Sequence, residues 1–352
     1  MEHLHEAVSR AILDRRQELS EAIIARQYAR QAAYWNGYEP TGRSKSLRDA
    51  GYHLTYLAEA VAAEDRSLFT DYVGWVKVLF AGLGFTDAVL PDTLQCTREV
   101  LHEALPPPMW AVVEPHLAAA DAALPAVATV PPSFLGDESK LTLLAHQYLE
   151  ALLAGDRHTA SRLILSAVES GASVRGIYLH VFQPVQREIG RLWQTNQVSV
   201  AQEHFCTAAT QLVMSQLYPY IFSANRINRR LVATCIGGEL HEIGMRMVAD
   251  FFEMDGWDTY FMGANTPLTS IMRSIQERQA DLLAISATMT FHVRGVNELI
   301  AAVRDMDGGR RLPILVGGYP FNVAPQLWRT VGADGYAVNA QEAVAAAMKL
   351  VD

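Results

Sequence analysis

The chain has 352 residues, of which 50% are hydrophobic and 19% charged, and its net charge is −9. This composition predicts a folded globular protein, the length predicts two or three domains, and the negative charge argues against a nucleic-acid-binding surface. No apolar run reaches the roughly 18 residues of a membrane helix, and the charged N-terminus does not resemble a signal peptide. We therefore expect a cytoplasmic protein that does not act at a membrane.

The first 138 residues are expected to hold one helical domain and a linker. Apolar residues recur at three- and four-residue steps through residues 1–104, as in "SEAIIARQYARQAAYW" and "SLFTDYVGWVKVLFAGLG", which predicts helices throughout. Residues 105–138 are rich in proline and alanine and contain one short helical stretch. We interpret this segment as a linker between domains.

Two further domains are expected after the linker. Four amphipathic segments with short connections in residues 139–226 predict a four-helix bundle. In residues 227–352 the pattern changes to short apolar runs that alternate with helical segments: "RLVATCIGG", "DTYFMG", "DLLAISATM", "LPILVGGYP" and "DGYAVNA". This alternation predicts a doubly wound parallel sheet of the Rossmann or flavodoxin-like type, so the fold class is multidomain α and α/β.

The three cysteines bear on the compartment and on zinc binding. Cys96, Cys206 and Cys235 are far apart and form no C-x-x-C pair. This pattern predicts a reducing compartment and no structural zinc site. We expect each thiol to be a buried small side chain.

Ligands of doubly wound sheets bind beyond the carboxyl ends of the strands. The residues of this chain expected there are Gly237, Glu239, His241, Ser286, Thr288, Gly317 and Gly318. In "GGELHEIG", Glu239 could hold one ring nitrogen of His241, as carboxylates do for metal-ligating histidines, and Gly244 would allow a ligand to approach. One histidine without further ligands suits a metal that arrives chelated in a macrocycle; by this motif alone, a solvent-exposed capping histidine remains an alternative.

Two downstream motifs complete a resemblance to a known family. "AISATM" places hydroxyl groups after one strand, and "ILVGGYP" places two glycines after the next. Together with "GGELHEIG" they make residues 229–352 resemble a cobalamin-binding domain, whose motif is D-x-H-x-x-G followed by S-x-[LT] and G-G. The resemblance implies that His241 is the lower axial ligand of cobalt and that Glu239, in place of the commoner aspartate, is its hydrogen-bond partner.

The resemblance also implies the rest of the cofactor pocket. Ser286 and Thr288 would line the pocket for the cofactor's base, and Gly317 and Gly318 would adjoin its nucleotide tail. Further residues expected in this pocket are Glu242, Ile243, Gly244 and Tyr319.

A second motif lies in the predicted bundle. In "GRLWQTNQVSVAQEHFCTA", Trp193 precedes Glu203 and His204 by ten and eleven residues, and "TNQ" breaks the helix, so the residues can face one cavity from consecutive helices. An indole can pack on an adenosyl group and a carboxylate can accept hydrogen bonds from ribose hydroxyls. The alternative is a core tryptophan beside a surface acidic–histidine pair.

This spacing resembles the W-x9-E-H motif of cobalamin-dependent photoreceptors. The resemblance implies that Trp193 and Glu203 cradle a 5'-deoxyadenosyl group, with Val200 in the same pocket, and that His204 lies near cobalt as a candidate upper ligand after photolysis. Repressors of that family carry a histidine directly after the tryptophan, whereas this chain has Gln194. His204, His180 and water therefore stay open as photoproduct ligands. The chain also lacks a helix-turn-helix, so we do not expect direct DNA binding.

The order of domains is similar to that of photocobilins, which pair adenosylcobalamin with a bilin. The resemblance implies a globin-like domain over residues 1–104 that binds biliverdin or a related bilin without a covalent bond. Aromatic walls and a few basic groups suit such a tetrapyrrole. An aromatic helical core with a solvated arginine face is the alternative. The bilin residues expected are Arg43, Tyr52, His53, Tyr56, Tyr72 and Trp75.

The sequence thus predicts a non-enzymatic light sensor. Photolysis of the cobalt–carbon bond would change the bundle and the quaternary structure of a homo-oligomer and so signal to an unknown output protein. A corrinoid carrier of a methyltransferase system and a light-independent cobalamin-sensing regulator remain as alternatives. A mutase is least supported, because the chain contains no substrate-binding barrel.

Overall fold

The computed structural model describes residues 2–35, 37, 41–136, 140–222, 225–307 and 309–351. The chain divides into two compact units. Unit 1 comprises Met1–Thr129, Met289–Arg294 and Val323–Thr330, and unit 2 comprises Val130–Thr288, Gly295–Asn322 and Val331–Asp352.

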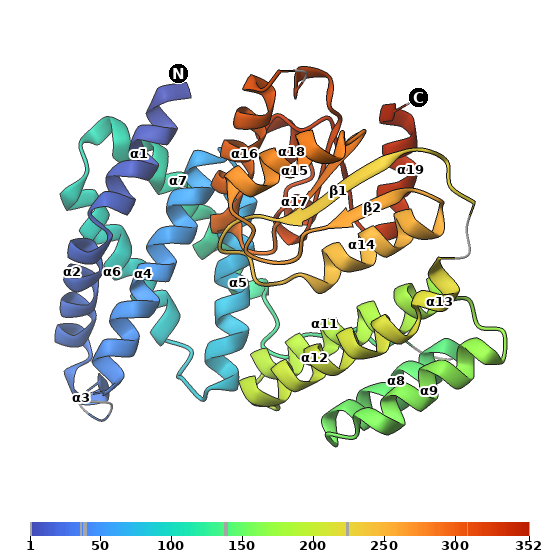
Figure 1. Cartoon of the computed structure of the whole chain (residues 1–352). Coiled ribbons are helices and arrows are strands. Elements are labelled where there is room, and N and C mark those ends of the chain that lie inside the picture. The colour runs from blue at the N-terminus through green and yellow to red at the C-terminus, as the bar shows by residue number, and fades with distance from the viewer. Residues whose placement is uncertain are drawn as a thin grey trace. The chain divides into compact units, whose positions relative to one another are not determined.

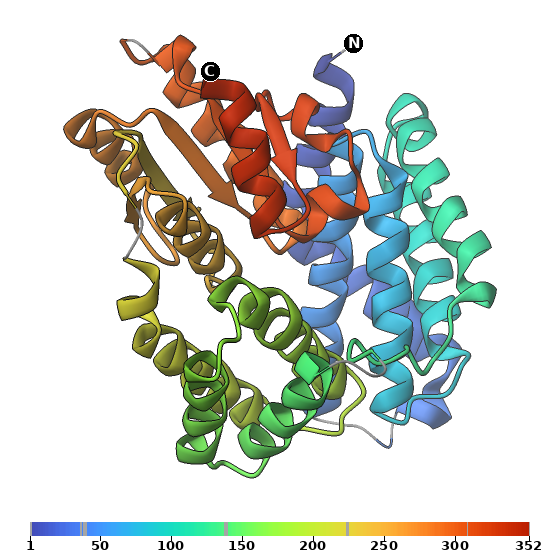
Figure 2. The same cartoon turned by 90° about the vertical axis from the view of Figure 1, so that its right-hand side faces the viewer.

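Unit 1 is helical, as its periodicity predicts. Helix α4 packs against α1 and α2, and α7 packs against α5 and α6 (blue to teal in Figure 2). Leu54, Leu57, Val61 and Leu117 are fully buried between these helices. The helices are α1 (Glu2–Asp14), α2 (Arg16–Arg30), α3 (Ala32–Trp35), α4 (Thr41–Ala62), α5 (Arg66–Gly82), α6 (Val89–Ala104), α7 (Pro107–Ala123), and the 3-10 turns η2 (Leu124–Ala126) and η4 (Thr290–His292).

The segment expected as a linker, residues 105–138, differs from that interpretation. Most of its first half forms α7, a helix of 17 residues that packs on α5 and α6, and unit 1 extends to Thr129. Pro106, Pro107 and Pro108 lie at the start of α7, where a missing N–H costs little, and the alanines that follow are strong helix formers. The proline-rich composition therefore marks the start of a helix of the first unit, and only residues after Thr129 connect it to the second.

Residues 140–222 of unit 2 form the predicted bundle (green to yellow in Figure 1). Asp156 caps α9 and a capping box of Ser199 and Gln202 begins α12. The elements are α8 (Lys140–Leu153), α9 (Arg157–Glu169), α10 (Val174–Ile177), η3 (Tyr178–Phe182), α11 (Gln183–Gln194), α12 (Val200–Gln216) and α13 (Tyr218–Ile221).

The third helix of the bundle is interrupted, which its periodicity did not predict. Its middle turn, η3, is a π-helical turn in which the N–H of Gln183 bonds to the carbonyl of Tyr178. Pro184 follows and has no N–H to continue the ordinary ladder, which favours the wider turn at this point. Such turns often occur at functional sites.

The remainder of unit 2 is a five-stranded parallel sheet in the order β2-β1-β3-β4-β5, so the predicted α/β domain is confirmed. Helices α14 and α19 pack side by side on one face, and α15 and α16 lie on the other (Figure 1). The strands are β1 (Arg230–Cys235), β2 (Asp258–Phe261), β3 (Leu282–Ser286), β4 (Ile314–Gly317) and β5 (Gly335–Ala337). The helices and the 3-10 turn that connect and follow them are α14 (Ile243–Met254), α15 (Leu268–Arg278), α16 (Val293–Asp305), η5 (Gly309–Arg311), α17 (Tyr319–Val323) and α19 (Ala340–Val351). The short helix α18 (Leu327–Thr330), between β4 and β5 in the chain, belongs to unit 1.

This strand order creates a crevice between β1 and β3. The chain leaves β1 toward β2 on one side and leaves β3 toward β4 on the other, so the two loops diverge at the carboxyl edge. The register pairs Cys235 with Ser286 and Ser286 with Gly317, which brings the ends of β1, β3 and β4 side by side. Among the described residues, no helix is both long and apolar enough to cross a membrane.

Candidate functional site

The loop between β1 and α14 holds a histidine through a buried carboxylate. Glu239 is fully buried, and its Oε1 accepts hydrogen bonds from the backbone N–H of His241 at 2.8 Å and from the Nδ1 of the same residue at 2.6 Å. The His241 side chain nevertheless remains 60% exposed. Because Nδ1 is engaged, Nε2 is the ring nitrogen presented to a ligand.

The second oxygen of Glu239 ties this loop to the loop after β3. The backbone N–H of Thr288 donates to Oε2 at 2.6 Å, so one carboxylate spans the crevice between β1 and β3. The hydrogen bond to Glu239 raises the pKa of His241 against the opposing effect of burial, and the charges of Glu239 and Glu203 add to the increase. Glu239 thus fixes both the orientation and the basicity of the ring.

Asn265, which the sequence did not single out, shapes the same loop. Its side-chain oxygen accepts from the N–H of Gly238, and its own backbone N–H donates to the carbonyl of Glu239, both at 2.8 Å. Gly238 has φ +85° and Asn265 has φ +50°, values that glycine and asparagine tolerate best. The turn that delivers Glu239 depends on these two residues together, a pairing between distant loops that no local motif reveals.

The glycines of the predicted pocket have different surroundings. Gly318 has φ +104°, and a Cβ there would lie 1.9 Å from the carbonyl oxygen of Ala287, so the backbone directly after β3 occupies that space. A Cβ on Gly317 would meet the Ala337 carbonyl at 3.3 Å, whereas one on Gly244 would have nothing within 4 Å. Of the three, Gly244 has the open space that a ligand's approach requires.

Several of the predicted pocket residues, and the neighbour of His241 in the sequence, are exposed apolar side chains. Leu240 is 70% exposed, Tyr319 at the start of α17 is 50% exposed, and Val200 at the start of α12 is 51% exposed. Ile243 is half-buried, and the Ser286 hydroxyl lies at the buried end of β3. Leu240 was not among the predicted residues, although an apolar residue between a carboxylate and a histidine is a signal that could have been used.

Glu242 lies differently from the other predicted pocket residues. Its Oε1 accepts from the side-chain amide of Gln211 on α12 at 2.7 Å, and its Oε2 accepts from the N–H of Ala264 at 2.9 Å. Both oxygens are therefore bonded to protein. The structure gives Glu242 a role in joining the loop after β1 to the bundle.

The residues predicted to cover the upper face lie on consecutive helices, as expected. Trp193 is half-buried near the end of α11, and Glu203 and His204 lie in the first turns of α12. Glu203 accepts from the Thr207 hydroxyl at 3.0 Å and lies 2.5 Å from the Nδ1 of His204, whose side chain is 74% exposed. Gln194 is buried, and His180 is exposed on the π turn.

The predicted bilin residues of unit 1 separate into two groups. His53, Tyr56 and Tyr72 form one cluster: the Nδ1 of His53 is 2.8 Å from the Tyr72 hydroxyl, and the rings of Tyr56 and Tyr72 stack at 3.7 Å. Burial lowers the pKa of His53 to about 4, so this histidine is neutral at physiological pH. Phe291, from the segment of unit 1 that follows β3, packs edge-on against Tyr56.

The other three bilin candidates lie at the surface. Arg43 lies over the ring of Tyr28 at 5.1 Å, and Trp75 is 36% exposed. Tyr52 is 49% exposed and lines a depression of about 350 Å³ together with Arg16 and Arg48. The aromatic cluster and the basic depression are thus separate features of this unit.

The three thiols are buried, as predicted. Burial raises the pKa of Cys96 and of Cys206 to about 11 and that of Cys235 to about 12. Such thiols are poor nucleophiles and poor metal ligands at neutral pH. Within the described ranges, no group of three or more histidine, cysteine or acidic side chains could hold a metal ion.

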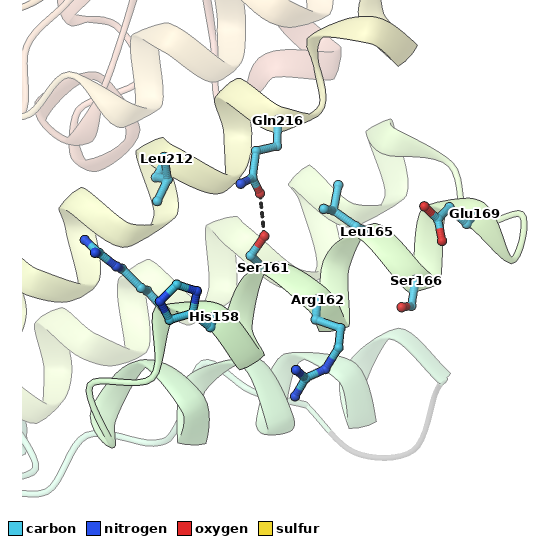
Figure 3. Close-up of a pocket in the computed structure, with 9 residues that line it drawn as sticks. His158, Ser161, Arg162, Leu165, Ser166, Glu169, Leu212 and Gln216 are labelled. Atoms are coloured by element: carbon cyan, nitrogen blue, oxygen red, sulfur yellow. Dashed lines mark hydrogen bonds between the residues drawn. The ribbon is translucent and has the colours of Figure 1, made fainter.

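A depression of about 620 Å³ lies between α9 and α12 of the bundle (Figure 3). Ser161 and Gln216 point toward each other across it and are hydrogen-bonded at 2.5 Å. None of its lining residues belongs to the predicted cobalamin or bilin sets. They are Arg157, His158, Ser161, Arg162, Leu165, Ser166, Glu169, Leu212 and Gln216.

The parallel sheet, its crevice and the carboxylate-held histidine together define the class of corrinoid-binding α/β proteins. The comparisons agree: residues 229–345 match a family model described as "B12 binding domain", and residues 144–218 match a second model with the same description. Dimethylamine corrinoid protein 3 of Methanosarcina acetivorans is 33% identical over 34% of this chain and 56% of its own length. Dimethylamine corrinoid protein 3 of Methanosarcina mazei is 30% identical over 34% of this chain and 71% of its own length.

A solved structure, that of the Methanosarcina barkeri monomethylamine corrinoid protein, shares the fold with a TM-score of 0.53 and 20% identity. The likeness covers 59% of this chain and 98% of that one. The chain spans about half the length of the first of the curated relatives that it matches. The chain belongs to the B12-binding protein family that includes these corrinoid proteins.

Proposed function

We propose that the chain binds a cobalamin with His241 as the lower axial ligand of cobalt. The observation that carries this proposal is the Glu239–His241 pair: a buried carboxylate holds Nδ1 at 2.6 Å while the ring stays 60% exposed. A fixed tautomer with an accessible Nε2 is what a metal-ligating histidine requires. The open space at Gly244 and the exposed Leu240 and Tyr319 fit a large, partly apolar ligand over the same edge.

The chain's own residues would divide the work of holding this cofactor. His241 would supply one nitrogen, and Glu239 would keep its orientation. Ser286 and Thr288 would face the cofactor's base beyond β3, and Gly317 and Gly318 would adjoin its nucleotide tail beyond β4. On the other side, Trp193, Val200 and Glu203 of the bundle would cover an adenosyl group and exclude water from it.

We further propose that the protein is a light sensor that uses adenosylcobalamin. Bound adenosylcobalamin supplies a cobalt–carbon bond that visible light breaks. Two observations favour a sensor: the tryptophan and the Glu203–His204 pair lie on consecutive helices of the unit that holds His241, and unit 1 adds a helical body with its own aromatic cluster. Loss of the adenosyl group would free α11 and α12 to shift, and a change of homo-oligomeric state would carry the signal to an output protein.

Unit 1 is the proposed site of a bilin such as biliverdin. Because His53 is neutral and buried, it would contact the tetrapyrrole rings rather than a propionate. Arg16 and Arg48, beside Tyr52, carry the positive charge that propionates need. This part of the proposal depends on unit 1 alone and can fail without affecting the cobalamin site.

A corrinoid carrier of a methyltransferase system is the second candidate function. The names of the relatives favour it, because dimethylamine and monomethylamine corrinoid proteins are the proteins that this chain resembles. A carrier would use the same His241 but would need an upper face that a methyltransferase can reach. The difference between the two candidates therefore lies above cobalt.

The lower ligand is tested by the absorption spectrum of the protein with added cobalamin. The wild type should give a spectrum in which histidine replaces the cofactor's own base, and His241→Ala should bind more weakly and lose that signature. His158→Ala, an exposed histidine on α9, is the matched control. An unchanged spectrum in His241→Ala would remove His241 from the cobalt site.

Light sensing is tested by illuminating the adenosylcobalamin complex with green light and measuring its spectrum and its oligomeric state. Photolysis with a change of assembly supports the sensor. Stable methylcobalamin binding without adenosyl preference supports the carrier, and adenosylcobalamin binding without any light response supports a light-independent regulator. A red absorption band that appears with added biliverdin tests the bilin separately.

A further inference from the structure

Helix α14, which starts two residues after His241, carries a row of polar side chains on one face. Glu242, Arg246 and Asp250 follow one another at four-residue intervals, a spacing that places them on the same side of a helix. We call these three residues the α14 polar row. Each of them bonds to a helix or turn of the bundle in unit 2, so the row faces the bundle.

Glu242 joins the histidine loop to α12. Its carboxylate accepts the Gln211 amide at 2.7 Å on one oxygen and the Ala264 N–H at 2.9 Å on the other. It is also the residue directly after His241. A displacement of α12 at Gln211 would therefore pull on the backbone next to the proposed cobalt ligand.

Arg246 adds three contacts to the same stretch of α12 and α13. One terminal nitrogen, Nη2, donates to the Ser215 hydroxyl at 2.7 Å and to the Tyr218 hydroxyl at 3.1 Å, and Nη1 donates to the Gln211 carbonyl at 3.3 Å. Because a guanidinium is planar and its N–H groups point in fixed directions, these contacts set the orientation of α12 as well as its distance.

Asp250 connects α14 to the other helix of the proposed cap. The Tyr178 hydroxyl donates to its carboxylate at 2.7 Å, and both side chains are buried. Tyr178 opens the π turn that leads into α11, the helix that carries Trp193. Hydrogen bonds have defined directions and apolar contacts do not, so the row fixes the register of both cap helices on α14.

Helix α12 carries a matching row. Glu203, Thr207, Gln211 and Ser215 lie at four-residue steps, and the last two contact the α14 polar row. Glu203 lies eight residues before Gln211, about 12 Å along the helix axis. The place at which Gln211 is held therefore decides where Glu203 lies over the site of His241.

We propose that the α14 polar row sets the position of α12 opposite His241 and thereby the size of the upper cobalamin ligand that the protein accepts. This inference rests on the proposed function, because it concerns the ligand opposite His241. Gln211, Glu242 and Arg246 are positioning residues: they act on the ligand through the placement of Glu203. A loosened row should reduce discrimination between large and small upper ligands while leaving the lower ligand in place.

The test exchanges the amide and the carboxylate of the Gln211–Glu242 hydrogen bond. Gln211→Glu sets two carboxylates at hydrogen-bond distance, where like charges repel. In the double variant Gln211→Glu with Glu242→Gln, the introduced amide can donate to the introduced carboxylate while its oxygen still accepts from Ala264. Dissociation constants for adenosylcobalamin and hydroxocobalamin are measured in the dark, together with the melting temperature and the amide exchange of residues 203–211 in the cofactor-free protein.

In the single variant, the preference for adenosylcobalamin over hydroxocobalamin should fall about tenfold, and the backbone amides of residues 203–211 should exchange faster. The double variant should restore both. Gln276→Glu, which adds the same charge on the exposed side of α15, should change neither. The spectrum of the histidine-ligated cofactor should be the same in all variants, because His241 is untouched.

Three results would overturn the inference. The first is that Gln211→Glu keeps the wild-type preference for adenosylcobalamin although the amides of α12 exchange faster. The second is that the double variant shows the same reduced preference as the single variant. If Gln211→Glu fails to fold, Arg246→Lys takes its place, because it keeps the charge but loses the bonds to Ser215 and Tyr218; an unchanged preference in Arg246→Lys is the third. A wild type that binds no cobalamin would instead refute the proposed function, which the first titration reveals.

Discussion

One oxygen of Glu239 accepts two hydrogen bonds from the same histidine, from the backbone N–H of His241 at 2.8 Å and from its Nδ1 at 2.6 Å. The other oxygen accepts the N–H of Thr288. The carboxylate is fully buried and accepts three hydrogen bonds, two of them from the residue whose ring it orients. The loop conformation and the state of the histidine are therefore set by the same side chain.

We expect Glu239→Gln to weaken cobalamin binding by roughly 10- to 100-fold, the usual effect of losing the partner of a metal-ligating histidine. An amide has one acceptor oxygen and one donor group, so it cannot accept from His241 and Thr288 at once. Absorbance titration measures the affinity, and thermal melting measures the fold. Glu253→Gln removes a buried carboxylate that bonds Arg226 and Thr259 away from the site, and should lower the melting temperature alone. Equal affinity losses in both variants would contradict the assignment.

Gly244 and Gly318 should respond differently to added side chains. A Cβ on Gly244 would have nothing within 4 Å, so Gly244→Leu should change the melting temperature little while cobalamin affinity falls, because the side chain would fill the ligand's space. Gly318→Ala places a Cβ 1.9 Å from the Ala287 carbonyl at φ +104°, so it should lower the melting temperature by several degrees even without cofactor. Unchanged cobalamin affinity in Gly244→Leu would show that the cofactor does not approach this helix end.

The sequence predicted the sheet, and the position of the candidate residues at its strand ends, because both depend on local patterns. Short apolar runs separated by helical segments specify a parallel sheet, and polar residues directly after its strands must lie at one edge. The bond between Glu239 and His241 could be expected because the two residues lie two apart in one loop. The membership of the B12-binding family follows from the same local motifs.

The contacts between distant segments could not be predicted in this way. Asn265 bonds Gly238 and Glu239 from another loop, and Gln211 bonds Glu242 from another helix, and neither pairing has a periodicity or a motif. The hydrogen bonds of Glu242, which the sequence predicts in the cofactor pocket, could not be foreseen for the same reason: its two oxygens accept from Gln211 and Ala264. The linker prediction failed because prolines at a helix start have the same composition as prolines in a loop.

Trp193→Ala should reduce the preference for adenosylcobalamin over methylcobalamin by about tenfold, because it removes the indole that is proposed to pack on the adenosyl group. The upper ligand of methylcobalamin is only a methyl group, so its binding should weaken little. Trp110→Ala, which truncates a half-buried tryptophan on α7 of unit 1, controls for a general loss of stability. Titration with the two cobalamins in the dark measures the ratio, and an identical ratio in Trp193→Ala and the wild type would argue for an open upper face, as in a carrier.

The Tyr178–Asp250 pair should make the stability of the protein depend on pH near 6. Burial raises the pKa of Asp250 from its ordinary value to about 6, against the opposing effects of the Tyr178 hydrogen bond and the positive charge of Arg246. Between about pH 4 and 6 the folded protein therefore binds this proton more tightly than the unfolded chain, for which a pKa of about 3.9 applies. The contribution of Asp250 to the stability of the folded state is fully present below pH 4 and is lost as the pH rises through 6.

Asp250→Asn should remove this dependence, because its carbonyl can still accept from Tyr178 but carries no charge to bury. At pH 8 the variant should be more stable than the wild type by roughly 1–3 kcal/mol, and below pH 4 the two should be alike. Asp305→Asn, an exposed carboxylate at the end of α16, should leave the pH profile of the wild type unchanged. Thermal melting of the cofactor-free proteins between pH 4 and 8 measures these differences. If Asp250→Asn were less stable than the wild type at pH 8, Asp250 would have to be ionised and held by Arg246 in the folded state.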